Sequence, residues 1–525
     1  GQTGMSLLKK FASVGSATMA SRVLGFVREA LIAYTLGAGP VSDAFYAAFR
    51  FPNLFRRLFA EGAFNSAFIP LFAKELQGGG EAAAQVFARQ VLSVLVFALI
   101  ALSAVAMIFM PFLVATIIAP KFAAIPEKFD LTVLLTRIMF PYLIAMSLVA
   151  MLSGILNSYR RYFLAAISPV LLNVVLVCVL LVAMQNGNNP QFVGIAMAVG
   201  VTLSGALQLV LLLHGVKRTG FHMRVGLPRL TAPVRRLLWL ALPAAITGGI
   251  TQLNLLVGQI IISGSNGAIA TVNFADRILQ LPLGVIGIAI GVVLLPELSR
   301  ALKGGDNQTV QTLQNQSLEF GLGLTVPAAM AFMIIPAPIV ALLFERGEFT
   351  RETTMVTAAV LAAFATGLPA FVLNKIFTPS FYAREDMRSP MWFAGVNAAI
   401  NVAGSLILFP ILGVVGIAIS TSLAGWVNAA LLGGLLYRDG QFRPRPKTLK
   451  RIALILVGSA IMGAMLAYAS SLAGTLLLDG SLLLRIGLML AMVCVSVFVY
   501  FTFVLLTGAM DRGQLLTLFR RKRKT

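Results

Sequence analysis

Charged residues are placed inside sequence that is otherwise typical of membrane-spanning helices. A charged side chain near the centre of a bilayer costs roughly 2.5–3.5 kcal/mol even on the lenient insertion scale. Several such residues in two consecutive spans must therefore face a water-filled cavity, a partner or a ligand. This limits the chain to folds that enclose a polar cavity. The charged residues lie between Arg22 and Lys74 and are Arg22, Arg28, Glu29, Asp43, Arg50, Arg56, Arg57 and Glu61.

The composition indicates a membrane protein with many spans. Of all residues, 58% are hydrophobic and 11% are charged, whereas a soluble domain carries about 25% charged residues. Apolar segments of about 20 residues recur, and this length spans a bilayer as a helix. The alternating pattern of barrel strands is not present in the sequence. We predict an all-α polytopic membrane protein with about 14 transmembrane helices.

The basic residues behind the net charge of +22 cluster in alternate loops. An excess of Lys and Arg marks the cytoplasmic loops of a membrane protein. The largest clusters are the links 217–236 and 438–451 and the tail 520–524. We therefore predict that both termini are cytoplasmic. The same placement argues against nucleic acid as the partner of these charges.

An internal repeat divides the chain into halves. Val193–Ala196 has the same four residues as Val415–Ala418, and Ser168-Pro169 recurs as Ser389-Pro390. Because each half holds six predicted spans, the two repeats are parallel, and a substrate site is expected near the midplane between them. The predicted segments are an N-lobe at 5–217, a C-lobe at 230–438, a C-terminal helix pair at 448–509 and a basic cytoplasmic tail at 510–525.

The two halves differ in charge. An ungapped alignment near their starts places charged residues of the first half opposite uncharged polar residues of the second, whereas the second keeps the pair Asp276-Arg277. The first lobe is therefore the one specialised for charge. The aligned pairs are Arg22 and Gln252, Glu29 and Gln259, Asp43 and Asn273, and Arg50 and Gln280.

The arginines favour an anionic ligand. Arginine stays ionised and presents a planar fork that suits phosphate oxygens. Five arginines in the first two spans exceed three acids there, so a phosphate or pyrophosphate is the ligand that fits best. The alternative is that the acids neutralise these arginines, or that the arginines extend to the membrane surface. The sequence carries no catalytic signature of the hydrolase or phosphate-loop type, and no metal or cofactor is predicted.

Several motifs resemble one known family. Ser21–Glu29 is similar to the pattern S-R-x-x-G-x-x-R-[DE], and Asp43–Phe45, Phe51–Phe64 and Ala275–Arg277 match further segments of the family. The chain resembles the MurJ (MviN) family of lipid II flippases, in the multidrug/oligosaccharidyl-lipid/polysaccharide exporter (MOP) superfamily. The resemblance extends from Met5 to the C-terminal tail.

The resemblance implies a MATE-like fold of two six-helix lobes with two additional C-terminal helices. It implies that the chain moves lipid II, the undecaprenyl-pyrophosphate-linked peptidoglycan precursor, across the bacterial inner membrane for cell-wall synthesis. The expected partners are lipid II, membrane lipids and the cell-wall synthesis machinery. Gln280 departs from the pattern, because some members carry an acidic residue there. Coupling to Na⁺ or to the membrane potential differs between members and stays open.

The predicted site follows from these arguments. Alternating access would expose the headgroup first to the cytoplasm and then to the periplasm, with the pyrophosphate held by arginines. The predicted substrate-binding residues are Arg22, Arg28, Arg56 and Arg277, and the predicted supporting cavity charges are Glu29, Asp43, Arg50, Arg57, Glu61 and Asp276.

Other functions would place different demands on the sequence. A flippase for another prenyl-linked oligosaccharide shares the same chemistry, whereas a MATE-like antiporter of cationic drugs would need an acidic cavity. An intramembrane enzyme acting on prenyl phosphates would need a base or a metal cluster. A scaffold for envelope assembly would not flip the precursor at all.

Overall fold

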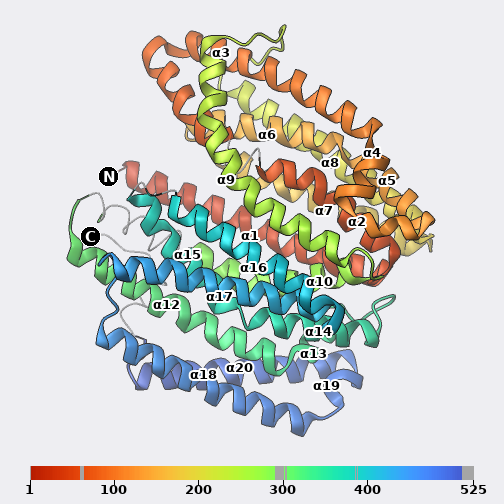
Figure 1. The fold of residues 1–525 in the computed structure, drawn as a ribbon, viewed down its shortest axis with the longest axis vertical. Coiled ribbons are helices and arrows are strands. Elements are labelled where there is room, and N and C mark those ends of the chain that lie inside the picture. The colour runs from red at the N-terminus through yellow and green to blue at the C-terminus, as the bar shows by residue number, and fades with distance from the viewer. Residues whose placement is uncertain are drawn as a thin grey trace. The chain divides into compact units, whose positions relative to one another are not determined.

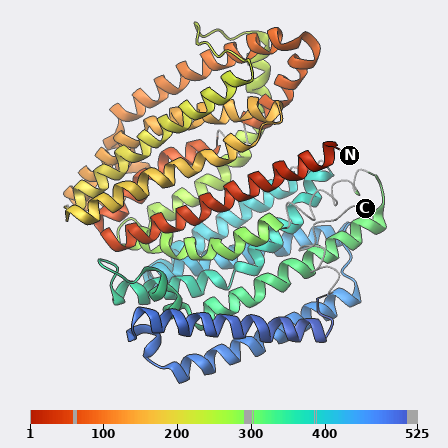
Figure 2. The same ribbon diagram turned by 180° about the vertical axis from the view of Figure 1, so that it is seen from behind.

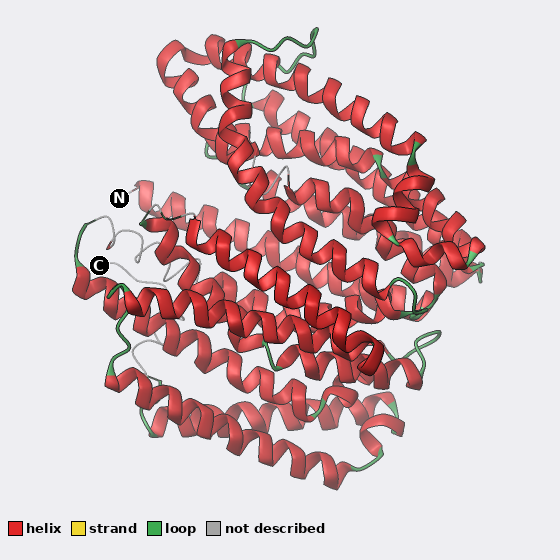
Figure 3. Cartoon of the chain, in the orientation of Figure 1, coloured by secondary structure: helices red, strands yellow, loops and turns green. Residues whose placement is uncertain are grey.

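The chain forms an all-helical protein in the computed structural model. The structure describes residues 2–58, 64–187, 189–289, 301, 304–384, 386 and 388–510. Within these ranges every regular element is a helix (Figure 3). Glu61, one of the predicted cavity charges, lies outside the described residues.

The described residues group into two compact units. The first comprises Gly1–Ala270 with Arg346–Phe349, and the second comprises Thr271–Glu345 with Thr350–Thr525. Figures 1 and 2 show both units from opposite sides, with the chain coloured from red at the N-terminus to blue at the C-terminus.

In the first unit, the long helix α1 packs against α7, α7 packs against α8, and α2 packs against α5. Helix α3 packs against α6 and α9. Gly80, with φ 74°, interrupts α3, so this helix is two segments across a kink. The helices are α1 (Gln2–Leu36), α2 (Pro40–Arg56), α3 (Phe64–Ile108), α4 (Met110–Leu113), η2 (Val114–Ile118), η3 (Pro120–Ala124), α5 (Pro126–Met139), α6 (Pro141–Ser158), α7 (Phe163–Asn186), α8 (Pro190–Arg218) and α9 (Ala232–Ile262).

The second unit begins within α10. Helices α16 and α17 form an antiparallel pair, and α12 packs against both α15 and α18. The helices are α10 (Ala268–Ala289), α12 (Asn307–Ile334), α13 (Pro336–Phe344), α14 (Arg351–Ala365), α15 (Leu368–Ala383), α16 (Arg388–Leu412), α17 (Val414–Arg438), α18 (Pro446–Ala473), α19 (Leu476–Asp479) and α20 (Leu482–Leu506).

The predicted C-terminal helix pair is α18 and α20, which pack against each other (Figure 1). Polar side chains attach the pair to α12. Arg451 of α18 donates to Glu319 at 2.8 Å, and Thr448 donates to the same carboxylate at 2.7 Å. The Tyr500 hydroxyl of α20 donates to the Gly323 carbonyl. Breaking a buried polar pair is costly, so these contacts hold α18 and α20 on the second unit.

Proline explains where many helices begin. Pro40, Pro126, Pro141, Pro190 and Pro446 occupy the first turn of their helices, where the missing N–H costs nothing because it has no intrahelical acceptor. Pro141 begins α6 directly after α5, within one apolar span that covers residues 126–158.

Ten described helices are long and apolar enough to cross a membrane, or eleven if the bent pair formed by α14 and α15 is one span. A polytopic all-α membrane protein is therefore confirmed, whereas the count of fourteen stays a prediction. Helix α1, which carries Arg22, Arg28 and Glu29, is not among the ten, and α2 is only 17 residues long.

Helix α9 belongs to the first compact unit. The sequence repeat assigns this helix to the predicted C-lobe at 230–438, but α9 packs against α3 and η2. Lys121 Nζ donates to the Ile261 carbonyl at 3.0 Å, and Gln259 Nε2 donates to the Ile118 carbonyl at 2.9 Å. These bonds attach the end of α9 to the segment that follows α4.

Candidate functional site

Arg28 of α1 lies in a buried polar network. It is 9% exposed, and Nη2 donates to Glu29 Oε1 at 2.9 Å. Nη1 donates to Asn173 Oδ1 of α7, also at 2.9 Å. Asn173 in turn donates to the Ser21 carbonyl, and the Tyr46 hydroxyl of α2 donates to Glu29. Three helices therefore orient one guanidinium group.

Glu29 neutralises Arg28 in this structure. This is the alternative that the sequence left open for the arginines. A guanidinium carries five N–H donors, and two of its nitrogens are engaged here. The sequence did not identify Asn173 and Tyr46 as members of the network. The one available signal for Asn173 was an amide within the apolar run of 163–186.

Arg28 and Arg56 lie near the same buried tyrosine. Tyr142 of α6 is 3% exposed, and both guanidinium groups are within electrostatic range of its hydroxyl. Arg56, at the end of α2, is half-buried, and its Nε donates to Asn53 Oδ1 at 2.7 Å. The structure therefore brings these two predicted ligand residues, from α1 and α2, to one region of the first unit.

The other arginines of the first unit differ in exposure. Arg22 is exposed on α1, six residues before the buried Arg28. Arg50 is half-buried, and Arg57 is exposed. Because an exposed side chain on α1 is open to a ligand without rearrangement, Arg22 fits a role in first contact better than Arg28 does.

Asp43 lies in a different setting from the one predicted. Its side chain is fully buried, and Oδ2 forms an ion pair with Lys128 Nζ at 2.9 Å. The carboxylate also accepts the N–H groups of Gly267 at 2.6 Å and Ala270 at 3.0 Å, at the start of α10. In this structure Asp43 contacts α5 and the α9–α10 turn, and its role as a cavity charge stays a prediction.

The sequence does not indicate that Lys128 is the partner of Asp43. Lys128 is 3% exposed, donates to Asn266 Oδ1 at 2.9 Å, and places Nζ 4.2 Å from the centroid of the Phe122 ring. From the sequence, Lys128 is one basic residue in a loop poor in Lys and Arg. Its 85-residue separation from Asp43 leaves no local signal of the pair.

Three turns of the chain meet beside this ion pair. The Glu348 N–H donates to the Tyr34 carbonyl at 3.0 Å, and a Cβ atom on Gly347 would collide with that same carbonyl. A Cβ on Gly37 would collide with the Glu348 carbonyl. A Cβ on Gly267 would lie 2.7 Å from the Ala38 carbonyl. We refer to the α1–α2 turn, the α9–α10 turn and residues 346–349 as the three-turn cluster.

Replacing Gly347 with alanine is expected to lower the free energy of unfolding by about 1–3 kcal/mol. Its φ of +57° strains an L-residue, and the added methyl group also meets the Tyr34 carbonyl. Gly187→Ala is a matched control, because Gly187 has φ +58° and open space around it. Thermal unfolding of the purified protein measures the loss of stability in both variants. Equal losses in the two variants would show that backbone strain alone matters and that the close approach does not.

The second unit contains Asp276 and Arg277 on α10. Asp276 is exposed, and Gln280 Nε2 approaches its Oδ1 at 3.4 Å. Gln280, the position that departs from the family pattern, therefore lies beside the acid of this pair. Arg277 is half-buried. Among the described residues, no group of three His, Cys, Asp or Glu side chains could hold a metal ion.

Solved membrane proteins share the fold of this chain at low sequence identity. A solved inward-facing MATE family multidrug resistance transporter of the MOP superfamily matches this chain with a TM-score of 0.66 at 16% identity, covering 82% of this chain and 98% of that one. A solved lipid II flippase MurJ in an inward closed conformation matches with a TM-score of 0.78 at 23% identity, covering 93% and 97%.

The chain belongs to the lipid II flippase MurJ family, whose model matches residues 32–487. A probable lipid II flippase MurJ of Rhizobium tropici is 48% identical over 99% of this chain and 98% of its own length. One of Rhizobium meliloti is 52% identical over 89% and 87%. The lipid II flippase MurJ of Burkholderia cenocepacia is 34% identical over 87% and 89%. The predicted family is confirmed, and the chain is a transporter, not an enzyme.

Proposed function

We propose that this chain moves lipid II from the cytoplasmic to the periplasmic leaflet of the bacterial inner membrane, for cell-wall synthesis. The observation that carries the proposal is membership of the lipid II flippase family over nearly the whole chain. The basic clusters in alternate loops support the orientation with both termini in the cytoplasm. The internal repeat, with six predicted spans in each half, supports a parallel arrangement of two lobes followed by a C-terminal helix pair.

Arginines bind the pyrophosphate in this proposal. A diphosphate cannot enter a membrane interior at tolerable cost unless cations pair with it. Arg22 makes the first contact because it is exposed, and Arg56 and Arg28 follow because both lie near Tyr142. Arg277 contributes from the second repeat. Further charged residues adjust the charge around the four substrate-binding arginines. They are Asp276, Arg50, Arg57 and Glu61.

Glu29 acts as a competitor for Arg28. In the structure Glu29 Oε1 forms an ion pair with Arg28 Nη2 at 2.9 Å. When the pyrophosphate enters, it accepts some of the hydrogen bonds that the Arg28 guanidinium donates to Glu29. When the substrate leaves, Glu29 accepts these hydrogen bonds again. Exchange of one anion for another avoids an unpaired buried charge at every stage.

The three-turn cluster closes the periplasmic side. By the predicted orientation, the α1–α2 turn and the α9–α10 turn are periplasmic, and they occupy equivalent positions in the two sequence repeats. Asp43 joins them through Lys128 and the N–H groups of Gly267 and Ala270. Alternating access then requires these bonds to open when the headgroup is released.

Reconstitution tests this function. The purified chain in proteoliposomes is expected to translocate fluorescent lipid II, while liposomes without protein do not. Varying the sodium gradient and the membrane potential independently identifies the driving force. Absence of translocation by protein that is folded, as judged by its thermal unfolding, would contradict the proposal. Native mass spectrometry is expected to find a co-purifying prenyl-pyrophosphate lipid, and another prenyl-linked oligosaccharide would redirect the substrate assignment.

A further inference from the structure

The segment that joins α8 to α9 is a loop of the first unit that is held against α3 (Figure 3). We call residues 221–231 the linker. Gln85 Nε2 of α3 donates to the His222 carbonyl at 2.8 Å, and the Gly226 N–H donates to Ser93 Oγ, also at 2.8 Å. Because these bonds use backbone groups of the linker, they fix its path along α3 independently of its side chains.

Both ends of the linker are also attached to the first unit. At its start, Phe221 is 3% exposed, and the centroid of its ring lies 5.7 Å from that of Phe72 and 6.5 Å from that of Tyr159. At its end, the Thr231 hydroxyl donates to Gln90 Oε1 at 3.1 Å. The exposed side chains between these ends therefore have a defined place on the surface.

The exposed side chains of the linker are apolar and basic. Leu227 is 82% exposed, Leu230 is 62% exposed and Val225 is 61% exposed. Arg224 and Arg229 are exposed as well. Between positions 217 and 236 the sequence has six Lys or Arg residues and no Asp or Glu. Aliphatic side chains mixed with arginines suit the boundary between lipid headgroups and acyl chains, which accommodates both kinds.

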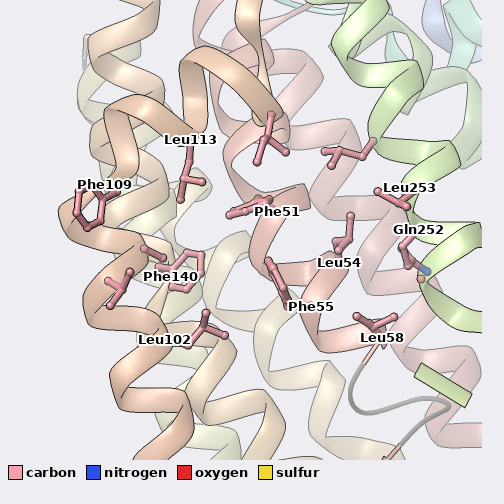
Figure 4. A pocket seen from close by; sticks show the side chains of 15 residues that line it. Phe51, Leu54, Phe55, Leu58, Leu102, Phe109, Leu113, Phe140, Gln252 and Leu253 are labelled. Atoms are coloured by element: carbon pink, nitrogen blue, oxygen red, sulfur yellow. The ribbon is translucent and has the colours of Figure 1, made fainter. Parts of the chain in front are cut away.

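The contacts with α3 place the linker at the edge of a membrane span. Arg89 is the last charged residue of α3, and residues 91–108 carry no charge. Gln90 lies at the edge of this apolar run, and Ser93, the partner of Gly226, lies inside it. Further along α3 and α9, side chains that are almost all apolar surround a cavity (Figure 4), which fits the membrane interior. The middle of the linker therefore reaches the depth at which acyl chains begin.

We propose that the linker inserts Val225, Leu227 and Leu230 into the cytoplasmic leaflet, where Arg224 and Arg229 bind the headgroups of anionic phospholipids. Basic residues close to a membrane are attracted by anionic lipids. A soluble acidic protein could meet the arginines but could not reach the aliphatic side chains at this depth. The proposal rests on the proposed function, which puts the linker on the cytoplasmic side, and adds a lipid-binding surface outside the substrate site.

A fluorescent label on the linker tests the insertion. The fluorophore NBD is attached through Leu227→Cys in the full chain, after Cys178→Ser and Cys494→Ser remove the two native thiols. Leu227 is highly exposed, so its replacement removes little packing within the chain. In nanodiscs with phosphatidylglycerol, doxyl-labelled lipids are expected to quench this label, whereas iodide in the water is not. Asp439→Cys, in the exposed turn after α17, is the control and should show the opposite quenching.

Removing charge tests the class of lipid. The fluorescence lifetime of NBD is longer among acyl chains than in water, so its two components give the ratio of inserted to water-exposed linker. Arg224→Gln combined with Arg229→Gln is expected to lower this ratio about 30-fold, which is about fivefold for each arginine near an anionic surface. Replacing phosphatidylglycerol with phosphatidylcholine should lower it by at least as much. Arg438→Gln removes an exposed charge elsewhere and should leave the ratio unchanged.

Two results would overturn the proposal. Iodide quenching of the linker label as strong as that of the Asp439→Cys control would show that the linker faces water and is open to a soluble partner. Equal lifetime ratios in the two lipids, with no effect of the arginine changes, would show that anionic headgroups are not bound.

Transport separates this proposal from the flippase function, because the quenching is measured without lipid II. A chain that flips lipid II while its linker stays in water would refute the lipid-binding surface alone. A chain whose linker is inserted but that does not flip lipid II would refute the function and support the surface.

Discussion

Replacing Arg28 with alanine is expected to lower lipid II translocation roughly 30-fold or more in proteoliposomes. Losing one partner of a buried, hydrogen-bonded charge pair costs about 2–5 kcal/mol, and each 1.4 kcal/mol corresponds to about tenfold in rate. Arg28→Lys should recover only part of the rate, because an ammonium group cannot form the bidentate fork. Arg438→Ala is the control, since Arg438 is highly exposed and pairs only loosely with its neighbour Asp439 at 3.5 Å.

A double variant separates substrate binding from internal neutralisation. If Arg28 served only to neutralise Glu29, the combined change Arg28→Ala with Glu29→Gln would remove both charges and restore transport. If Arg28 binds the pyrophosphate, the double variant stays inactive although its thermal stability recovers. Wild-type rates for Arg28→Ala would refute the role of this residue in transport altogether.

The second large effect is expected at the ion pair of Asp43 and Lys128. Asp43→Asn leaves the ammonium group of Lys128 buried without its carboxylate and should lower the free energy of unfolding by about 3–5 kcal/mol. Asp43→Asn with Lys128→Met should cost less than Asp43→Asn alone, because the second change removes the uncompensated charge. Thermal unfolding in detergent measures these differences as shifts of the melting temperature.

The exposed ion pair of the second unit supplies the control. Arg351 pairs with Asp479 at 2.9 Å, and the two side chains are 41% and 61% exposed. Asp479→Asn should therefore cost less than about 1 kcal/mol. Equal destabilisation by Asp479→Asn and Asp43→Asn would show that burial does not set the strength of the pair.

These two sites suggest a division of roles among the charged residues of α1 and α2. Arg28 and Glu29 form a pair that an anion can enter, because Arg28 retains further donors and lies near Arg56 and Tyr142. Asp43 uses both carboxylate oxygens on protein groups. Under the proposed function, the charged residues of α1 and α2 serve substrate binding in one place and closure in another.

Sequence patterns alone identified the class and the family. The apolar runs predicted a helical membrane protein because backbone groups in lipid must be satisfied within helices. The segments Ser21–Glu29 and Phe51–Phe64 identified the family, which the matches to known relatives confirm. These features are runs and motifs of residues that are consecutive in the chain, so they can be read directly from the sequence.

Only the tertiary structure decided which charges are paired. Whether Asp43 faces a cavity or a buried lysine depends on α5, and whether Arg28 is held in place depends on Asn173 of α7. Ion pairing falls off over a few ångströms, so it is set by the distance between helices that are remote in sequence. The sequence determined that this chain places charged residues within membrane-spanning helices. The packing of those helices determined which partner each charged side chain has.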